Sequence, residues 1–175
     1  MNQQQALLDI VSDDVKRVVP AANFLSDLPE SNAELLRLLT RERRPANRHG
    51  ILYALTWHAL PADWELMVRI VADETEHPTV RGQAAEALSY AFYQHAPESP
   101  EFGSGVRVLV AALRSTEAEV RYCAANALGA TKQRSLIPVL EALFDDDARP
   151  EGWVGSVADE ARRAIEWIGP AESAH

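Results

Sequence analysis

A chain of 175 residues with 47% hydrophobic and 25% charged side chains is long enough to bury the core of one soluble domain. Its 26 acidic and 17 basic residues give a formal net charge of −9, which repels phosphate backbones and favours basic partner surfaces. The single cysteine, Cys123, excludes an intrachain disulfide.

In chain order, the apolar spacing and the turn residues predict a series of helices. Pro20 is expected to kink or restart the first, and Ser12 to Asp14 to break it or cap a second helix. Residues 96–105 hold two prolines and two glycines and are predicted to form a loop. We expect Gly129 to end its helix at the C′ position. The predicted helices span residues 3–27, 33–43, 47–60, 64–73, 79–94, 106–114, 119–129, 135–144 and 156–168.

One sequence skeleton recurs along the chain. Residues 119–129 read E-V-R-Y-C-A-A-N-A-L-G, and residues 79–89 read T-V-R-G-Q-A-A-E-A-L-S. Fainter copies begin near Arg48 and Val157, so the intervals between copies run from 33 to 40 residues. Repeats of this length with two helices each are typical of a solenoid, in which neighbouring units must stack to bury their apolar faces.

At these two stretches the chain resembles the HEAT family, in its short bacterial HEAT-like form. The resemblance implies an all-α, right-handed α-solenoid of about four helix pairs, preceded by an N-terminal capping helical segment. It also implies a single domain over residues 1–175, with the cap at 1–28 and helix pairs at 31–60, 62–95, 104–130 and 134–169. The last unit departs from the motif, because Ala158 stands where the motif has arginine.

HEAT-like arrays mostly bind proteins through the concave surface formed by the second helix of each pair. Residues just off the buried stripe of those helices should face outward, and one turn further on lie aromatic side chains. We expect Trp57 and Trp167 mainly to fill gaps between repeats. The predicted partner-binding residues are His49, Tyr53, Glu86, Tyr90, Tyr93, Tyr122, Asn126, Asp159 and Arg163.

Charged residues recur at equivalent positions of the repeats. Arg48, Arg81 and Arg121 are predicted to form an intramolecular ladder with acidic or backbone groups, a role that suits the many donors of a guanidinium. The acidic turns at residues 73–76 and 145–147 are expected to be solvated, with attraction of a basic partner as the alternative.

No known catalytic or metal-binding motif occurs in the chain. No His is followed by Glu, no phosphate-binding glycine loop is present, and Cys123 is expected to be an inert buried thiol. We therefore predict no catalytic residue, no metal and no cofactor, and a protein that is not an enzyme.

The predicted function is a non-catalytic protein-binding module whose partner has a basic surface, for example an inhibitor such as an immunity protein. The sequence start lacks a signal-peptide pattern, and no stretch reaches the roughly 18 apolar residues of a membrane span, so a cytoplasmic protein without membrane contact is expected.

Two alternatives stay open. The first is a nucleic-acid-binding or DNA-repair protein, which the arginines between residues 37 and 48 would favour, although the net charge makes nucleic acid an unlikely partner. The second is a bilin lyase-like HEAT-repeat enzyme, in which the aromatic face would cradle a flat ligand.

Overall fold

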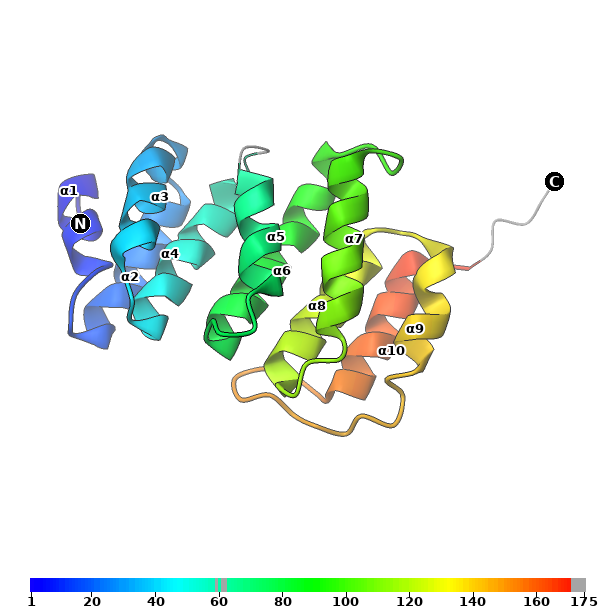
Figure 1. Ribbon diagram of the computed structural model, residues 1–175. Helices are drawn as coiled ribbons and strands as arrows, with labels where there is room; N and C mark the ends of the chain where they lie inside the picture. Colours follow the sequence, from blue (N-terminus) through cyan, green and yellow to red (C-terminus); the bar gives the residue numbers. More distant parts are fainter. Residues whose placement is uncertain (59, 61–62, 171–175) are drawn as a thin grey trace.

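The computed structural model describes residues 1–58, 60 and 63–170. In these residues the chain forms ten α-helices and no strand, as predicted for an all-α solenoid. Consecutive helices form antiparallel pairs that stack along one axis (Figure 1). The helix bounds are α1 Gln3–Asp9 with α2 Val15–Ser26, α3 Asn32–Arg41 with α4 Pro45–His58, α5 Trp64–Ala72 with α6 Pro78–Ala91, α7 Pro100–Ala112 with α8 Ala118–Ala130, and α9 Ile137–Glu141 with α10 Val157–Ile168.

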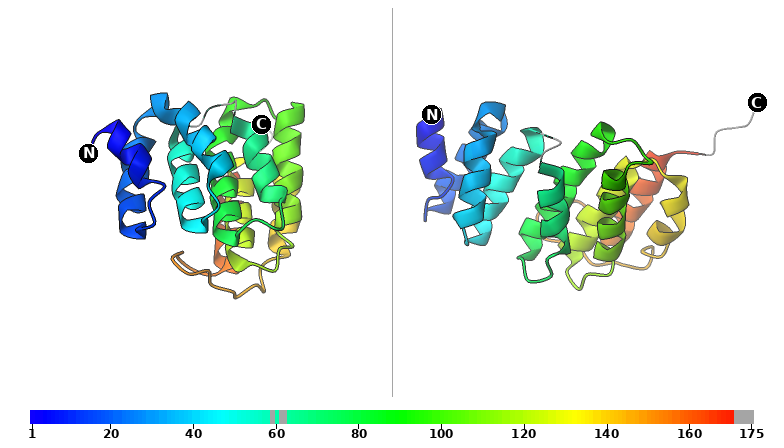
Figure 2. Two further views of the ribbon diagram at one scale, coloured as in Figure 1. Left: turned by 60° about the vertical axis from the view of Figure 1, so that its left-hand side comes forward. Right: turned by 45° about the horizontal axis from the view of Figure 1, so that its top comes forward.

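The second helices of the pairs form one continuous layer. Helices α2, α4, α6, α8 and α10 each contact the next in this order, and the first helices lie on the other side (Figures 1 and 2). Small residues such as Ala84, Ala85, Ala124 and Ala125 are fully buried in this layer, where helices pack closely. We call the outer surface of the layer the second-helix face.

The first predicted helix is in fact a pair. α1 ends at Asp9, and Asp14 caps α2 by accepting a hydrogen bond from the Lys16 N–H at 3.0 Å. α2 then runs through Pro20 to Ser26. The N-terminal segment therefore packs on α4 in the same way as the later pairs pack on each other.

The loop predicted at residues 96–105 is wrong, because α7 begins at Pro100. The Ser99 side chain caps it by accepting from the Phe102 N–H at 3.1 Å, and proline is favoured in a first helical turn. Gly105 serves packing rather than a turn, since a Cβ there would overlap the Trp64 indole and lie 3.2 Å from Phe92. In this stretch a proline thus begins a helix, and a glycine leaves space for the side chain of a neighbouring helix.

Two other helix ends differ from prediction. Gly129 does not end its helix, because α8 continues to Ala130 and Gly129 lies against the backbone of Ala164 in α10. The helix expected at residues 135–144 is shorter, as α9 spans only Ile137–Glu141 and Ser135 lies in the 3₁₀ turn before it. The last helix, α10, ends at Ile168 as predicted, and Gly169 follows it at φ 85°. Residues 61 and 62, which precede the next predicted helix, fall outside the described residues.

The predicted arginine ladder is confirmed. Arg48 donates to Glu76 (Nε to Oε2, 3.0 Å) and to the Leu39 carbonyl at 2.8 Å. Arg81 donates to the Val71 carbonyl at 3.1 Å. Arg121 donates to the Asp146 carboxylate at 2.7 and 3.1 Å and to the Ser115 carbonyl at 2.8 Å. Each arginine therefore ties a second helix to a neighbouring turn or first helix. Glu76 and Asp146, one from each acidic turn, are the ionic partners of Arg48 and Arg121.

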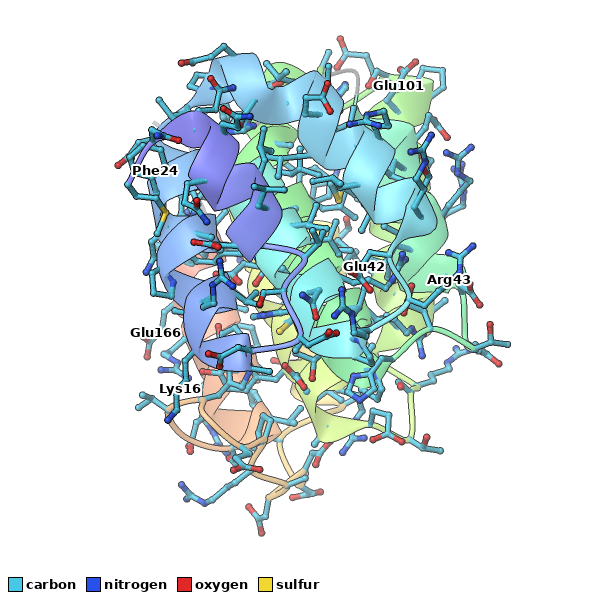
Figure 3. All side chains as sticks on the ribbon, turned by 90° about the vertical axis from the view of Figure 1, so that its left-hand side faces the viewer. Lys16, Phe24, Glu42, Arg43, Glu101 and Glu166 are labelled. Atoms are coloured by element: carbon cyan, nitrogen blue, oxygen red, sulfur yellow. The ribbon has the colours of Figure 1, made fainter. Side chains whose placement is uncertain are left out.

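The buried Glu42 makes stability dependent on pH. Its carboxylate pairs with Arg44 and accepts the backbone N–H groups of Arg43 and Arg44, between α3 and α4 (Figure 3). The hydrogen bond from the Arg44 side chain is the main cause that lowers the pKa of Glu42 from 4.5 to about 2. A lowered pKa stabilises the fold above the unfolded pKa, and the stabilisation is lost as pH falls through the folded pKa.

We therefore expect Glu42→Gln to lower the free energy of unfolding at pH 7 by about 2 kcal/mol. The difference in the free energy of unfolding between the variant and the parent should disappear as the pH falls from 4.5 to about 2, as measured by urea denaturation. Glu34→Gln is the control, because the Glu34–Arg37 pair is about half exposed on both sides and should contribute little. A gap that persists at pH 2 would contradict the assignment.

No helix within the described residues is both long and apolar enough to cross a membrane.

Candidate ligand- and partner-binding face

The second-helix face carries exposed apolar side chains that the core does not use. Val15 and Val19 on α2 are 54% and 60% exposed, and Trp57 on α4, Tyr90 on α6 and Trp167 on α10 are 41–50% exposed. Apolar side chains that gather on one face mark binding surfaces more often than single exposed ones do. The face also has a hollow at each of its two ends.

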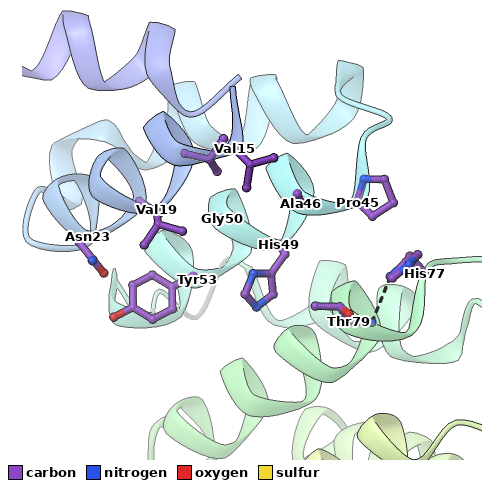
Figure 4. A pocket seen from close by; sticks show the side chains of 12 residues that line it. Val15, Val19, Asn23, Pro45, Ala46, His49, Gly50, Tyr53, His77 and Thr79 are labelled. Carbon is purple, nitrogen blue, oxygen red and sulfur yellow. Dashed lines mark hydrogen bonds between the residues drawn. The ribbon is translucent and has the colours of Figure 1, made fainter. Parts of the chain in front are cut away.

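The first hollow, which we call the N-terminal hollow, lies between α2, α4 and the start of α6 (Figure 4). Its volume is about 670 Å³. Gly50 lets α4 approach α2 at its floor, since a Cβ there would lie 2.8 Å from Val18 Cγ1. Most of the lining is apolar. The lining residues are Val15, Val18, Val19, Ala22, Asn23, Pro45, Ala46, His49, Gly50, Tyr53, His77 and Thr79.

His49 supplies a polar group in the N-terminal hollow. Burial lowers the pKa of its imidazole, against the opposing effects of Glu119 and of a hydrogen bond with Gln83. The imidazole is therefore neutral at pH 7 and can both donate and accept a hydrogen bond. At the edge of the hollow the Thr79 N–H donates to His77 Nδ1 at 3.3 Å (Figure 4).

An aromatic row extends from the N-terminal hollow across the middle of the face. The Tyr53 and Trp57 rings are 6.2 Å apart in an edge-to-face arrangement, and Trp57 lies 5.1 Å from Tyr90. Trp57 packs against Tyr90 of the next repeat, as expected of a residue between repeats, but half of its side chain is also exposed on the face. Burial raises the pKa of the half-buried Glu86 and, together with the charge of Glu86, that of Tyr90.

The second hollow, which we call the Tyr122 pocket, has a volume of about 490 Å³ and lies at the C-terminal end of the face. Sequence reasoning expected Tyr122 to be exposed, but only 4% of it is. The loop before α10 covers it, because the Trp153 ring packs 5.0 Å away and the Tyr122 hydroxyl donates to the Val154 carbonyl at 3.0 Å. The pocket is lined by Tyr122, Asn126, Gly152, Trp153, Val154, Glu160, Arg163 and Trp167.

Polar contacts hold the Tyr122 pocket together. The buried Glu160 carboxylate accepts from Asn126 Nδ2 at 2.8 Å and pairs with Arg163 at 2.5 Å. Arg163 also donates to the Tyr122 hydroxyl and the Val154 carbonyl, both at 2.7 Å. Sequence reasoning missed Trp153 and Glu160. The sequence signal that could have pointed to Trp153 is its place between two glycines, Gly152 and Gly155. Both glycines have positive φ values in the structure, which allow the loop to turn back.

The structure thus distributes the nine predicted partner-binding residues over several places. His49 and Tyr53 line the N-terminal hollow, while Tyr122, Asn126 and Arg163 line the Tyr122 pocket. Glu86 and Tyr90 lie between them. Tyr93 is 81% exposed and lines neither hollow. Asp159 caps α10 by accepting the Ser156 N–H at 2.9 Å, a contact that lowers its pKa.

The basic stretch of residues 37–48 is largely paired within the chain. Arg37 pairs with Glu34, Arg44 with Glu42 and Asp13, and Arg48 with Glu76. These pairs neutralise much of the charge that a phosphate backbone would need. Among the described residues, no group of three or more His, Cys, Asp or Glu side chains could hold a metal ion.

The comparisons with known proteins agree with this architecture. Residues 75–153 match the family model of HEAT repeats. This part of the chain therefore contains HEAT-like repeats. A chain in the solved complex of CpcE and CpcF of phycocyanin lyase from Nostoc sp. PCC7120 is similar to this HEAT-like chain, with a TM-score of 0.73 and 17% sequence identity. The similarity covers 93% of this chain and 96% of that one. No curated protein matches the sequence.

The prediction that the HEAT-like chain is not an enzyme is overturned by this comparison, because a solved structure similar over nearly the whole chain is part of a lyase. The prediction rested on missing catalytic motifs. Such motifs describe sites on strand–turn–helix or zinc-binding elements, and a site assembled from the face of a repeat array carries none of them. The likeness itself shows the fold.

Proposed function

We propose that this HEAT-like chain is a lyase-type subunit that binds a linear tetrapyrrole in the N-terminal hollow and a protein partner elsewhere on the second-helix face. The N-terminal hollow carries the proposal. Its volume of about 670 Å³ lies within the range of roughly 300–1,000 Å³ typical of small-molecule pockets, which are mostly apolar with a few polar groups. A flat, largely apolar ligand with pyrrole N–H groups and carbonyls suits such a lining.

The polar residues of the hollow would orient the ligand. His49 is neutral and can accept a hydrogen bond from a pyrrole N–H or donate one to a ring carbonyl. Tyr53 offers a ring face and a hydroxyl one helical turn from His49 on α4. Val15 and Val19 would exclude water from the ligand, because their exposed methyl groups border the opening (Figure 4). Binding and orientation are the parts of a lyase reaction that these residues can perform.

A protein partner is the second part of the proposal. The similar solved structure is a complex of two proteins, CpcE and CpcF, and exposed aromatic side chains such as Trp57 and Tyr90 are enriched at protein interfaces. The net charge of −9 favours a partner with a basic surface.

Biliverdin, a linear tetrapyrrole, tests the ligand. We expect its absorbance spectrum to change on titration with the purified chain, and Val19→Asp to weaken binding at least about tenfold, because a carboxylate replaces apolar contact in the hollow. Val19 is 60% exposed, so the variant should fold. Val154→Asp is the matched control, since Val154 is 78% exposed and lies at the other end of the face. Absence of a spectral change, or equal weakening by both variants, would refute the proposed site.

A further inference from the structure

The Tyr122 pocket is an addition to the repeat pattern that the proposed tetrapyrrole site does not use. The loop before α10 leaves the stack, turns back at Gly152 and Gly155, and brings Trp153 onto the second-helix face. Helix α10 contributes Trp167 from the opposite side. Three aromatic rings therefore surround a hollow of about 490 Å³ next to the buried Glu160 carboxylate.

Two of these rings already hold cations from the chain itself. The Arg163 guanidinium carbon lies 5.7 Å from the centre of the Tyr122 ring, and Lys132 Nζ lies 4.7 Å from the centre of the Trp167 ring. Both distances fall within the roughly 6 Å of a cation–π contact. The ring faces of this pocket are thus arranged to receive positively charged groups.

The buried carboxylate at the base of the pocket pairs with a guanidinium. The Glu160 side chain is only 5% exposed, and its ionic partner, Arg163, is 45% exposed. Burial is the main cause that raises the pKa of Tyr122 to about 12, and the nearby Glu160 adds to it. The exposed residues Glu151 and Glu166 are chain neighbours of the lining residues Gly152 and Trp167.

We propose that the Tyr122 pocket binds an arginine side chain of a protein partner, which takes the place of Arg163 on Glu160 between the aromatic rings. Arg163 is nearly half in solvent, and an incoming guanidinium has the same donors to replace its contacts with Glu160, the Tyr122 hydroxyl and the Val154 carbonyl. The exchange of one guanidinium for another keeps the buried carboxylate paired, so neither state leaves an uncompensated charge. This inference concerns the partner and does not depend on the ligand of the N-terminal hollow.

Calorimetric titration with a glycine-spaced peptide of three arginines tests the proposal, with the same peptide carrying neutral citrulline in place of arginine as the ligand control. We expect Trp153→Ala to weaken arginine-peptide binding at least about fivefold through the lost cation–π contact. Arg163→Gln should strengthen binding about fivefold, because it removes the internal competitor. Citrulline peptide should not bind.

Arg162→Gln is the matched variant, since Arg162 lies on the same helix at 50% exposure but faces the Phe144 ring instead. It changes the net charge by the same amount, so its affinity should stay within about twofold of the parent. Weaker binding by Arg163→Gln, equal gains in both arginine variants, or binding of the citrulline peptide would each overturn the proposal. Biliverdin binding should be the same in all three variants, which separates this test from that of the N-terminal hollow.

Discussion

Replacement of Gly129 by alanine is expected to destabilise the protein by about 2–3 kcal/mol, although the same change in an ordinary helix interior stabilises by up to about 1 kcal/mol. An added Cβ would lie 2.9 Å from the Ala164 Cα, 3.0 Å from its Cβ and 3.1 Å from its carbonyl oxygen. Two of these three atoms belong to the backbone, so no side-chain rotation relieves the contact. Helices α8 and α10 would have to move apart.

Gly103→Ala is the matched control for this prediction. Gly103 also lies inside a helix, α7, but a Cβ there would meet only Arg107 Nη1 at 3.2 Å, at the end of a flexible side chain. We expect this variant to gain about 0.5–1 kcal/mol from helix propensity. Urea denaturation with unchanged m-values should show opposite signs for the two substitutions. Stabilisation by Gly129→Ala would mean that α8 and α10 are not in close contact.

Arg121→Met is expected to lower the free energy of unfolding by about 2–4 kcal/mol. The Arg121 and Asp146 side chains are only 15% and 19% exposed, and methionine keeps the apolar part of the arginine stem. The change leaves the Asp146 carboxylate without its cation and the Ser115 and Thr116 carbonyls without a donor. It also removes the main cause of the lowered pKa of Asp146, so the variant should lose less stability than the parent as pH falls through the range below 3.8.

Arg162→Met is the control for the ladder. Its pair with Asp159 spans 3.6 Å and both side chains are about half exposed, so we expect a loss below about 1 kcal/mol. A double-mutant cycle of Arg121→Met with Asp146→Asn would isolate the pair, with a coupling energy of at least about 1 kcal/mol expected. Equal small losses in the free energy of unfolding at Arg121 and Arg162 would show that the ladder stabilises the stacked repeats no more than an exposed ion pair does.

The two hollows are the basis of two separate proposals about function. The N-terminal hollow is largely apolar and sized for a small molecule, whereas the Tyr122 pocket combines aromatic rings with a buried carboxylate. We propose that the chain holds a ligand at one end of the face and a side chain of a protein partner at the other. The biliverdin and arginine-peptide titrations test the two halves of this idea independently.

The sequence by itself determined the repeat, the second helices of the middle units and the arginine ladder. These features depend on local spacing: the alanines of residues 79–89 and 119–129 repeat with helical period, and Arg48, Arg81 and Arg121 follow the same turn in each unit. The resemblance to HEAT-like proteins rested on the same residues. It was therefore sound for the fold, whereas the prediction that the chain is not an enzyme rested on missing catalytic motifs and was overturned by the comparison.

Only the tertiary structure decided which residues form the candidate sites. Gly105 and Gly129 look like helix breakers in the sequence, but they are contact points for Trp64 and Ala164, which lie 41 and 35 residues away along the chain. Tyr122 follows the pattern of an exposed residue until Trp153, from a loop with no repeat pattern, covers it. Helical periodicity fixes the face on which a side chain lies, whereas its burial depends on chain segments that are remote in sequence.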